Sequence, residues 1–402
     1  MKLSKMSTDP APMAPKAHAP LHFPYMFWAH HEMGTPSWSL AQSGMPSPAP
    51  ELLGPEELEP AEATSANLAH PSMDAIPRLE SQIAARYGVS PDRVMLTMGA
   101  SSAMHLLAAS FLTAGTRVAV DLPSYQPFRA LPPYFGAHLV EVLRREHNSW
   151  RLAPEDVEAA LDASGTTDPA HIFFTNPSNP TGALSDLADL QALGKIASDR
   201  GGILICNESY MDLTPPAEQV RCAVHVPNSI TIGSFTKPYG LGALRVGWIV
   251  LGEGLADERT RLLDNIYLNY VDPPTAALRI ALRASEKLDA LLGPFETFAA
   301  SSRPLLFNWI TNTPGVSALC AKRGLVVFAR IANWDAEGEL LPGDTNTEEL
   351  SAFLAMNFDL AVTPGEFFGQ PGCLRLGFGS PKEHIQEGLS RLTSGLAAWR
   401  TR

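Results

Sequence analysis

The feature that most constrains this chain is an alternation, from about residue 75 to residue 290, of short apolar runs with longer amphipathic stretches. The apolar runs are nearly continuous, which is typical of strands that are buried on both faces. Seven runs are candidate strands: 94–98, 117–121, 137–143, 171–175, 203–207, 229–233 and 245–251. Candidate helices lie between them, at 100–113, 155–162 and 185–200. The alternation therefore predicts an α/β fold with a mostly parallel seven-stranded sheet flanked by helices.

The regions on either side of this alternation differ from it in composition. Residues 1–20 alternate Ala, Pro and Met, so we expect a disordered arm there. Residues 21–69 are aromatic-rich and then Pro-rich, and we expect an irregular lead-in that packs with the small domain. Residues 70–295 then form the large domain, and residues 296–402 form a second, smaller α+β domain. This last region contains two further strand-like runs and a terminal helix, at 325–331, 373–378 and 383–400.

Charge and cysteine content exclude several classes of protein. The chain has 30 Lys and Arg against 42 Asp and Glu, a net charge of −12 without a basic block. We therefore expect neither a nucleic-acid nor a membrane partner. No apolar run approaches the roughly 18–20 residues of a membrane helix, and the first residues lack the apolar core of a secretory signal. None of the four cysteines lies in a CxxC pair, so we expect no metal site and a cytoplasmic location.

Polar turns follow five of the predicted strands, at the strand ends where open α/β sheets bind ligands. The turns read GASS from 99, PSY from 123, NPSNPTG from 176, NESY from 207 and SFTK from 234. A glycine–serine turn that opens a helix offers N–H groups to a phosphate, and Ser234 and Arg245 can add a hydroxyl and a guanidinium. Tyr125 can stack on a flat ring, and Lys237 can form a Schiff base with an aldehyde.

In order and spacing, these motifs resemble those of the class I/II aminotransferases, which are pyridoxal-phosphate-dependent enzymes of fold type I. The resemblance rests on NPSNPTG, NESY, GASSA, the SFTK motif with Arg245 eight residues after Lys237, and LRLGFG at 374–379. It extends over roughly residues 40–380. It implies pyridoxal 5'-phosphate as cofactor, an α-amino acid and a keto acid as small-molecule partners, and a homodimer with shared active sites.

The resemblance also implies a role for each matching residue. Lys237 is expected to carry the cofactor as a Schiff base and to act as base at the substrate Cα, with Tyr210 and Asn207 beside it. Cofactor contacts are expected from Gly99, Ala100, Ser101, Tyr125, Asn179, Asn207, Tyr210, Ser234, Lys237 and Arg245. Substrate contacts are expected from Arg375, which would pair with the α-carboxylate, and from Gly44 and Asn179.

The sequence departs from the family pattern in three places. Asn207 stands where the family has an aspartate that keeps the pyridine nitrogen protonated, and an amide carries no charge. The neighbouring Glu208 does not substitute for it, because adjacent strand residues point to opposite faces. His70 lies near the position from which a partner tyrosine reaches the phosphate. Tyr267 lies where members that act on acidic side chains have an arginine, which argues against aspartate as substrate.

Three functions remain open from the sequence. The first is an aminotransferase of an α-amino acid. The second is a lyase, cyclase, decarboxylase or oxidative deaminase of specialised amino-acid metabolism, suggested by Asn207. The third is a regulator that binds the cofactor without turnover. Such proteins carry an upstream winged-helix domain, whereas about 20 Pro/Ala-rich residues precede the fold here and the net charge is −12, so we do not expect this function.

Overall fold

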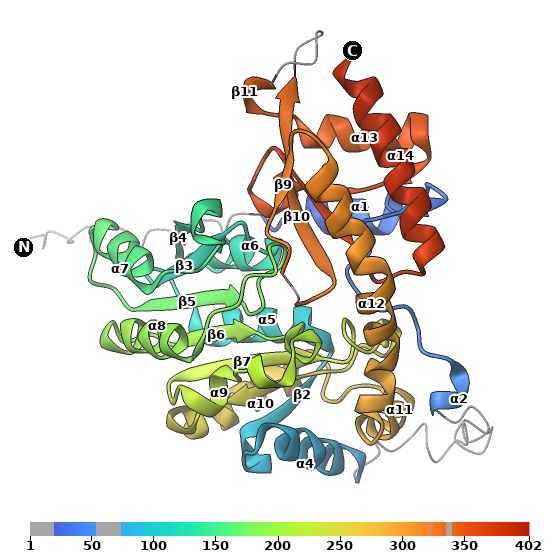
Figure 1. Ribbon diagram of the computed structural model, residues 1–402. Helices are drawn as coiled ribbons and strands as arrows, with labels where there is room; N and C mark the ends of the chain where they lie inside the picture. Colours follow the sequence, from blue (N-terminus) through green and yellow to red (C-terminus); the bar gives the residue numbers. More distant parts are fainter. Residues whose placement is uncertain (1–19, 54–73, 322, 335–339, 402) are drawn as a thin grey trace, which may run out of the picture.

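The computed structural model describes residues 20–53, 74–321, 323–334 and 340–401. Nearly all of the predicted disordered arm, much of the lead-in and His70 lie outside these residues. Figure 1 shows two bodies of secondary structure, one built on a large sheet and one on a smaller sheet. None of the described helices has the length and apolar character that crossing a membrane requires.

The large sheet has seven strands in the order β2-β8-β7-β6-β5-β3-β4. Their bounds are Val94–Thr97 (β2), Arg117–Leu122 (β3), His138–Leu143 (β4), Ala170–Thr175 (β5), Leu204–Asn207 (β6), Ser229–Ser234 (β7) and Gly247–Leu251 (β8). β8 runs antiparallel to both of its neighbours, β2 and β7, and the other strand pairs are parallel. Every residue of the inner strands is buried, whereas only Val142 is buried in the edge strand β4. The predicted fold class is therefore confirmed.

Helices cover both faces of this sheet because successive strand residues point to opposite sides. Phe173 packs with α5, α6 and α10, whereas Ile172 and Phe174 pack with α7 and α8. α4 and α11 cover the end formed by β2 and β8. The bounds are Ala75–Tyr87 (α4), Gly99–Phe111 (α5), Gln126–Tyr134 (α6), Pro154–Ala163 (α7), Leu187–Asp199 (α8), Cys222–His225 (α9), Arg259–Asn269 (α10) and Thr275–Ser285 (α11).

The smaller sheet is antiparallel and has the order β11-β10-β14-β13, with β9 paired to β10. The strands span Val316–Ala318 (β9), Val326–Trp334 (β10), Leu340–Asp344 (β11), Thr363–Pro364 (β13) and Cys373–Gly377 (β14). It packs with α12 (Leu288–Asn312), α13 (Thr347–Phe358) and α14 (Lys382–Arg400). In Figure 1, α12 runs from α11 to α14. The sequence places the domain boundary inside this helix, and that division stays a prediction.

The N-terminal segment is more regular than the sequence suggested. It contains α1 (Pro24–His31), α2 (Pro50–Leu53) and β1 (Trp38–Ser39), which pairs in parallel with β12 (Leu360–Ala361). The expectation of an irregular lead-in is therefore wrong for α1. Pro24 occupies the first turn of α1, where a proline is tolerated. The first six residues of this helix are all apolar, so it lacks the periodicity that identifies a helix in a sequence.

Candidate active site

A cavity of about 760 Å³ opens between the carboxyl ends of β5, β6 and β7, the first turn of α5, and the N-terminal segment. Because the carboxyl ends of parallel strands meet at one sheet edge, the polar turns that follow them converge there. Nine of the predicted site residues line the cavity: Ala100, Ser101, Tyr125, Asn179, Asn207, Tyr210, Ser234, Lys237 and Arg245. Gly44, Gly99 and Arg375 do not line it themselves but contact residues that do.

Lys237 presents its amine to the cavity from the turn after β7. Its Nζ donates to Ser43 Oγ at 3.1 Å, and its carbonyl accepts from the Met45 N–H at 2.9 Å. None of the described carboxylates lies at ion-pair distance from this amine. A Cβ on Gly44 would lie 3.4 Å from Lys237 Cδ, so the N-terminal segment packs directly against the lysine side chain.

The first turn of α5 forms an anion-binding corner of the cavity. Gly99 begins this helix with φ +79°, a conformation that favours glycine, and a Cβ there would lie 2.8 Å from Arg245 Nη2, so the guanidinium would have to shift. The helix has no side-chain N-cap, which leaves its first N–H groups available. Arg245 donates from Nη2 to the Met98 carbonyl at 3.3 Å, and Ser101 and Ser234 line the same cavity. Free N–H groups, hydroxyls and a guanidinium are the donors that phosphate prefers.

Asn207 ends β6 with a defined set of hydrogen bonds. Its Oδ1 accepts from the Ser209 N–H at 3.0 Å and from Ser209 Oγ at 2.7 Å. Its Nδ2 lies 3.9 Å from Met104 Sδ. Glu208 points away from the cavity, as the strand alternation predicts, and its Oε1 accepts from the Cys222 N–H at 2.6 Å. Burial raises the pKa of Glu208 to about 7, although Arg221 favours its charged form.

Arg375 is a guanidinium buried to 1% exposure on β14. Its Nη1 donates to Asn179 Oδ1 at 3.3 Å, and its Nη2 donates to the Tyr25 hydroxyl at 3.0 Å and the Ala41 carbonyl at 3.1 Å. Its Nε has no hydrogen-bond partner. Within the described residues no carboxylate pairs with it. Since burying an unpaired charge is costly, this arginine is suited to an anionic ligand.

Tyr25 and Ser43 are site residues that sequence reasoning missed. Tyr25 comes from α1, and its ring meets Tyr125 edge-on at 6.2 Å between centroids. Burial alone would raise the pKa of Tyr25, but nearby Arg375 and Lys237 favour the phenolate, and the net pKa is lowered. Ser43 joins two predicted residues, because its carbonyl accepts from the Tyr210 hydroxyl at 2.8 Å and its hydroxyl accepts from Lys237. No local motif marked either residue.

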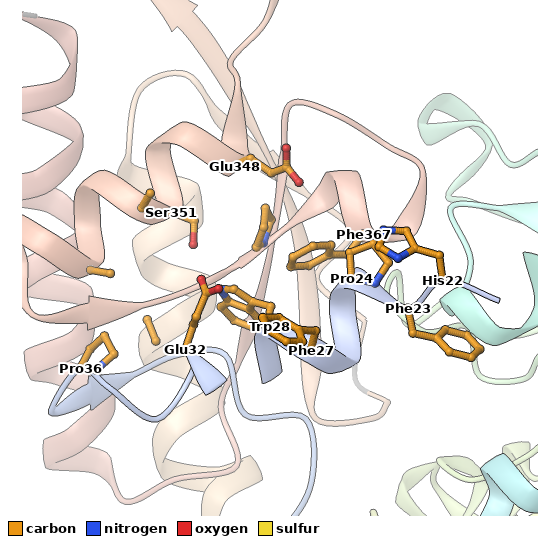
Figure 2. Close-up of a pocket in the computed structure, with 14 residues that line it drawn as sticks. His22, Phe23, Pro24, Phe27, Trp28, Glu32, Pro36, Glu348, Ser351 and Phe367 are labelled. Carbon is orange, nitrogen blue, oxygen red and sulfur yellow. The ribbon is translucent and has the colours of Figure 1, made fainter. Parts of the chain in front are cut away.

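A second, apolar cavity of about 570 Å³ lies on the other side of α1, between this helix and α13. Figure 2 shows Trp28 and Phe367 at its centre, with ring centroids 5.6 Å apart, and Ser351 and Glu348 on the α13 side. The helix therefore lies between two cavities, and only one of them contains the predicted site residues. Tyr267, by contrast, lies on α10 at 53% exposure and lines neither cavity.

Comparisons with known proteins identify relatives of this chain. A capreomycidine synthase of Streptomyces vinaceus is 28% identical over 325 residues, which are 79% of this chain and 78% of that protein. An aspartate aminotransferase of Streptomyces avermitilis is 28% identical over 330 residues, 79% of each chain. Both relatives are matched over most of their length.

Solved structures share the fold. A PLP-dependent aminotransferase from Streptococcus suis has a TM-score of 0.80 at 22% identity, covering 93% of this chain and 96% of that one. The PLP-dependent cyclase OrfR has a TM-score of 0.76 at 22% identity, covering 97% and 100%. The family model for aminotransferase class I and II matches residues 42–392, and this family is pyridoxal-phosphate-dependent. Since that match spans most of the sequence, the chain belongs to the aminotransferase class I and II family.

Proposed function

We propose that this chain is a pyridoxal-phosphate-dependent aminotransferase that acts on an α-amino acid. The observation that carries the proposal is a pair of cations without a carboxylate partner among the described residues. One is the Lys237 amine in the cavity, and the other is the Arg375 guanidinium buried beside it. An amine of this kind can bind an aldehyde covalently, and a guanidinium can bind a carboxylate through two parallel hydrogen bonds.

The cavity residues fit pyridoxal 5'-phosphate. The corner at α5 supplies phosphate donors, and Gly99 leaves room there for the Arg245 guanidinium. Lys237 would hold the aldehyde carbon through Nζ, and the Tyr125 ring would pack against the pyridine. The remaining contacts would come from Ala100, Ser101, Asn179, Asn207, Tyr210, Ser234 and Arg245. When bound, the cofactor withdraws electrons from the substrate Cα.

The chain's own residues would then orient the substrate and move its proton. Arg375 would bind the α-carboxylate of the substrate. Its present hydrogen bonds to the neutral oxygens of Asn179 and Ala41 would then give way to a charged partner. Lys237 Nζ would act as the base that takes the proton from the substrate Cα and would hold it at this atom. Ser43 Oγ accepts from this Nζ and would keep the amine within the cavity during the transfer.

We further propose a homodimer and a cytoplasmic location. Three large apolar side chains at the end of α10 are exposed: Tyr267 at 53%, Leu268 at 85% and Val271 at 55%. An exposed apolar cluster of this kind supports contact with a second copy. The four cysteines are all free thiols, which is the expected state in a reducing compartment.

The test is an absorbance spectrum of the purified protein, repeated after adding each common amino acid alone without a keto acid. Conversion of the yellow aldehyde form to the amine form by one amino acid supports transamination and identifies the donor. A protein that binds no cofactor in covalent form contradicts the proposal. Size-exclusion chromatography with light scattering tests the dimer, and charged substitutions at Leu268 should weaken it.

A second candidate function is favoured by Asn207. A neutral amide in place of a carboxylate makes the bound cofactor a weaker electron acceptor, which disfavours the proton movements of transamination. Relatives of the chain include a capreomycidine synthase and a cyclase. A lyase, cyclase, decarboxylase or oxidative deaminase would form product while the aldehyde form returns. We expect Asn207→Asp to raise transamination; a loss of all activity in that variant would favour the second candidate.

A further inference from the structure

We propose that Asn207 donates an N–H hydrogen bond to the pyridine nitrogen of the cofactor, and that this nitrogen is consequently unprotonated. Ser209 is the positioning residue that fixes the amide in this orientation. The proposal rests on the proposed function, because it requires the cofactor to bind in the cavity described above. An aspartate at this position accepts a hydrogen bond from a protonated pyridine nitrogen. The Asn207 amide would instead donate to an unprotonated one, so the direction of the hydrogen bond is reversed.

The Ser209 backbone N–H fixes the orientation of the Asn207 amide, because this group can donate a hydrogen bond but cannot accept one. The backbone N–H of Ser209 can only donate, so the side-chain atom that it meets at 3.0 Å must be the oxygen. The Ser209 hydroxyl donates to the same oxygen at 2.7 Å. Rotating the amide by half a turn would place its NH2 against the Ser209 backbone N–H, which cannot accept a hydrogen bond. The loop after β6 therefore specifies which end of the amide remains free.

The free end of the amide is a donor with no strong acceptor. Nδ2 can only donate, and the neighbour assigned to it among the described residues is the thioether of Met104 at 3.9 Å, a weak acceptor. Asn207 and Ser209 are exposed by only 4% and 7%, and both line the cavity. A buried N–H without a good acceptor is costly, so a ligand that offers a lone pair there is favoured. An unprotonated pyridine nitrogen offers one, and a protonated nitrogen does not.

The charges around the cavity support the same protonation state. No Asp or Glu is among the described residues that line it, whereas Lys237 and Arg245 both do. The closest carboxylate along the strand belongs to Glu208, which points to the opposite face and accepts from the Cys222 N–H and Thr231 Oγ1. Asp121 is paired with Arg144 at 2.7 Å. The cavity therefore lacks the negative charge that would stabilise a positively charged ring.

The experiment measures the ring nitrogen directly. The wild-type protein is reconstituted with pyridoxal phosphate carrying nitrogen-15 in the ring, and the nitrogen-15 resonance is recorded near neutral pH without substrate. We expect the chemical shift of an unprotonated pyridine in the wild type. In Asn207→Asp we expect a displacement to the shift of the protonated ring. A wild-type resonance at the protonated position would overturn the proposal, even if the variant failed to fold.

Glu208→Gln is the matched control, because it removes the neighbouring carboxylate and leaves Asn207 intact. We expect its ring-nitrogen shift to equal that of the wild type. A change in this variant would mean that Glu208 governs the ring, and would overturn the assignment to Asn207. If the labelled cofactor binds to Lys237 in none of the three proteins, the wild type included, the proposed function itself fails. This outcome is distinct from a protonated ring in a protein that does bind the cofactor.

Discussion

The two walls of the site cavity differ in chemistry. The wall formed by strand ends and by α5 contains Lys237 and Arg245, the two charged residues among the described residues that line the cavity, together with most of its hydroxyl and amide groups. The opposite wall comes from the N-terminal segment and is mainly apolar, with Phe23, Met26 and Met33 among its residues. We infer that the first wall performs the chemistry, whereas the second selects the substrate side chain. The predictions below test this division, beginning with the largest expected effect.

Lys237→Ala should abolish turnover, because it removes both the anchor and the base from the polar wall. A loss of at least about 10²–10⁴-fold in kcat is expected from the missing proton transfer alone. The yellow aldehyde band should also be absent, which absorbance measures independently of activity. Circular dichroism should remain unchanged, since Lys237 forms no described ion pair. Substantial turnover in this variant would assign the chemistry to another residue.

Arg375→Gln should weaken the use of every amino-acid donor by a similar factor. The α-carboxylate is common to all donors, and losing one partner of a buried charge pair costs about 2–5 kcal/mol. We therefore expect kcat/KM to fall by roughly 10²-fold or more. Arg375→Lys is the control, since it keeps the charge but not the planar fork. An effect confined to one donor would place Arg375 at the side chain instead.

The apolar wall of the cavity should determine which amino-acid donors the enzyme prefers. The described cavity has no carboxylate for a cationic side chain, and its cations lie on the polar wall. Donors with uncharged, apolar side chains should therefore exceed aspartate and arginine by about 10²-fold in kcat/KM, because a buried charge needs a partner. Met26→Lys should raise activity towards acidic donors relative to the wild type. Equal rates for aspartate and leucine would contradict the division between the walls.

The two walls also differ in how far the sequence predicts them. Asn207 is the last residue of β6, and Lys237 lies in the turn after β7. The strand pattern and the local motif together therefore locate both residues at the carboxyl ends of the strands. Tyr25 and Ser43 enter the site through contacts with Arg375 and Lys237, which are 350 and 194 residues away in the chain. No local pattern encodes such contacts. Arg375 could be assigned by resemblance, but its lack of a carboxylate partner is visible only in three dimensions.

Glu208 provides the smallest predicted effect, on stability rather than activity. Its pKa is about 7 in the folded chain against 4.5 ordinarily, because burial disfavours the charged form. Between pH 4.5 and about 7 the folded state therefore binds more protons than the unfolded state, so stability falls as pH rises through this window. The loss attributable to Glu208 is at most about 3 kcal/mol. Below pH 4.5 the carboxyl is protonated in both states and contributes no slope.

Glu208→Gln should remove this contribution, because an amide keeps an oxygen for the Cys222 N–H and does not titrate. The variant should gain free energy of unfolding relative to the wild type as pH rises from 4.5 to about 7, measured by denaturant titration at each pH. Substitution of the exposed Glu383 by Gln is the control and should leave the slope unchanged. Glu80, whose pKa is also raised to about 7, retains its own contribution in both proteins. A variant with the wild-type slope would show that Glu208 is charged in the folded chain, and the back of the polar wall would then carry a negative charge directly behind Asn207.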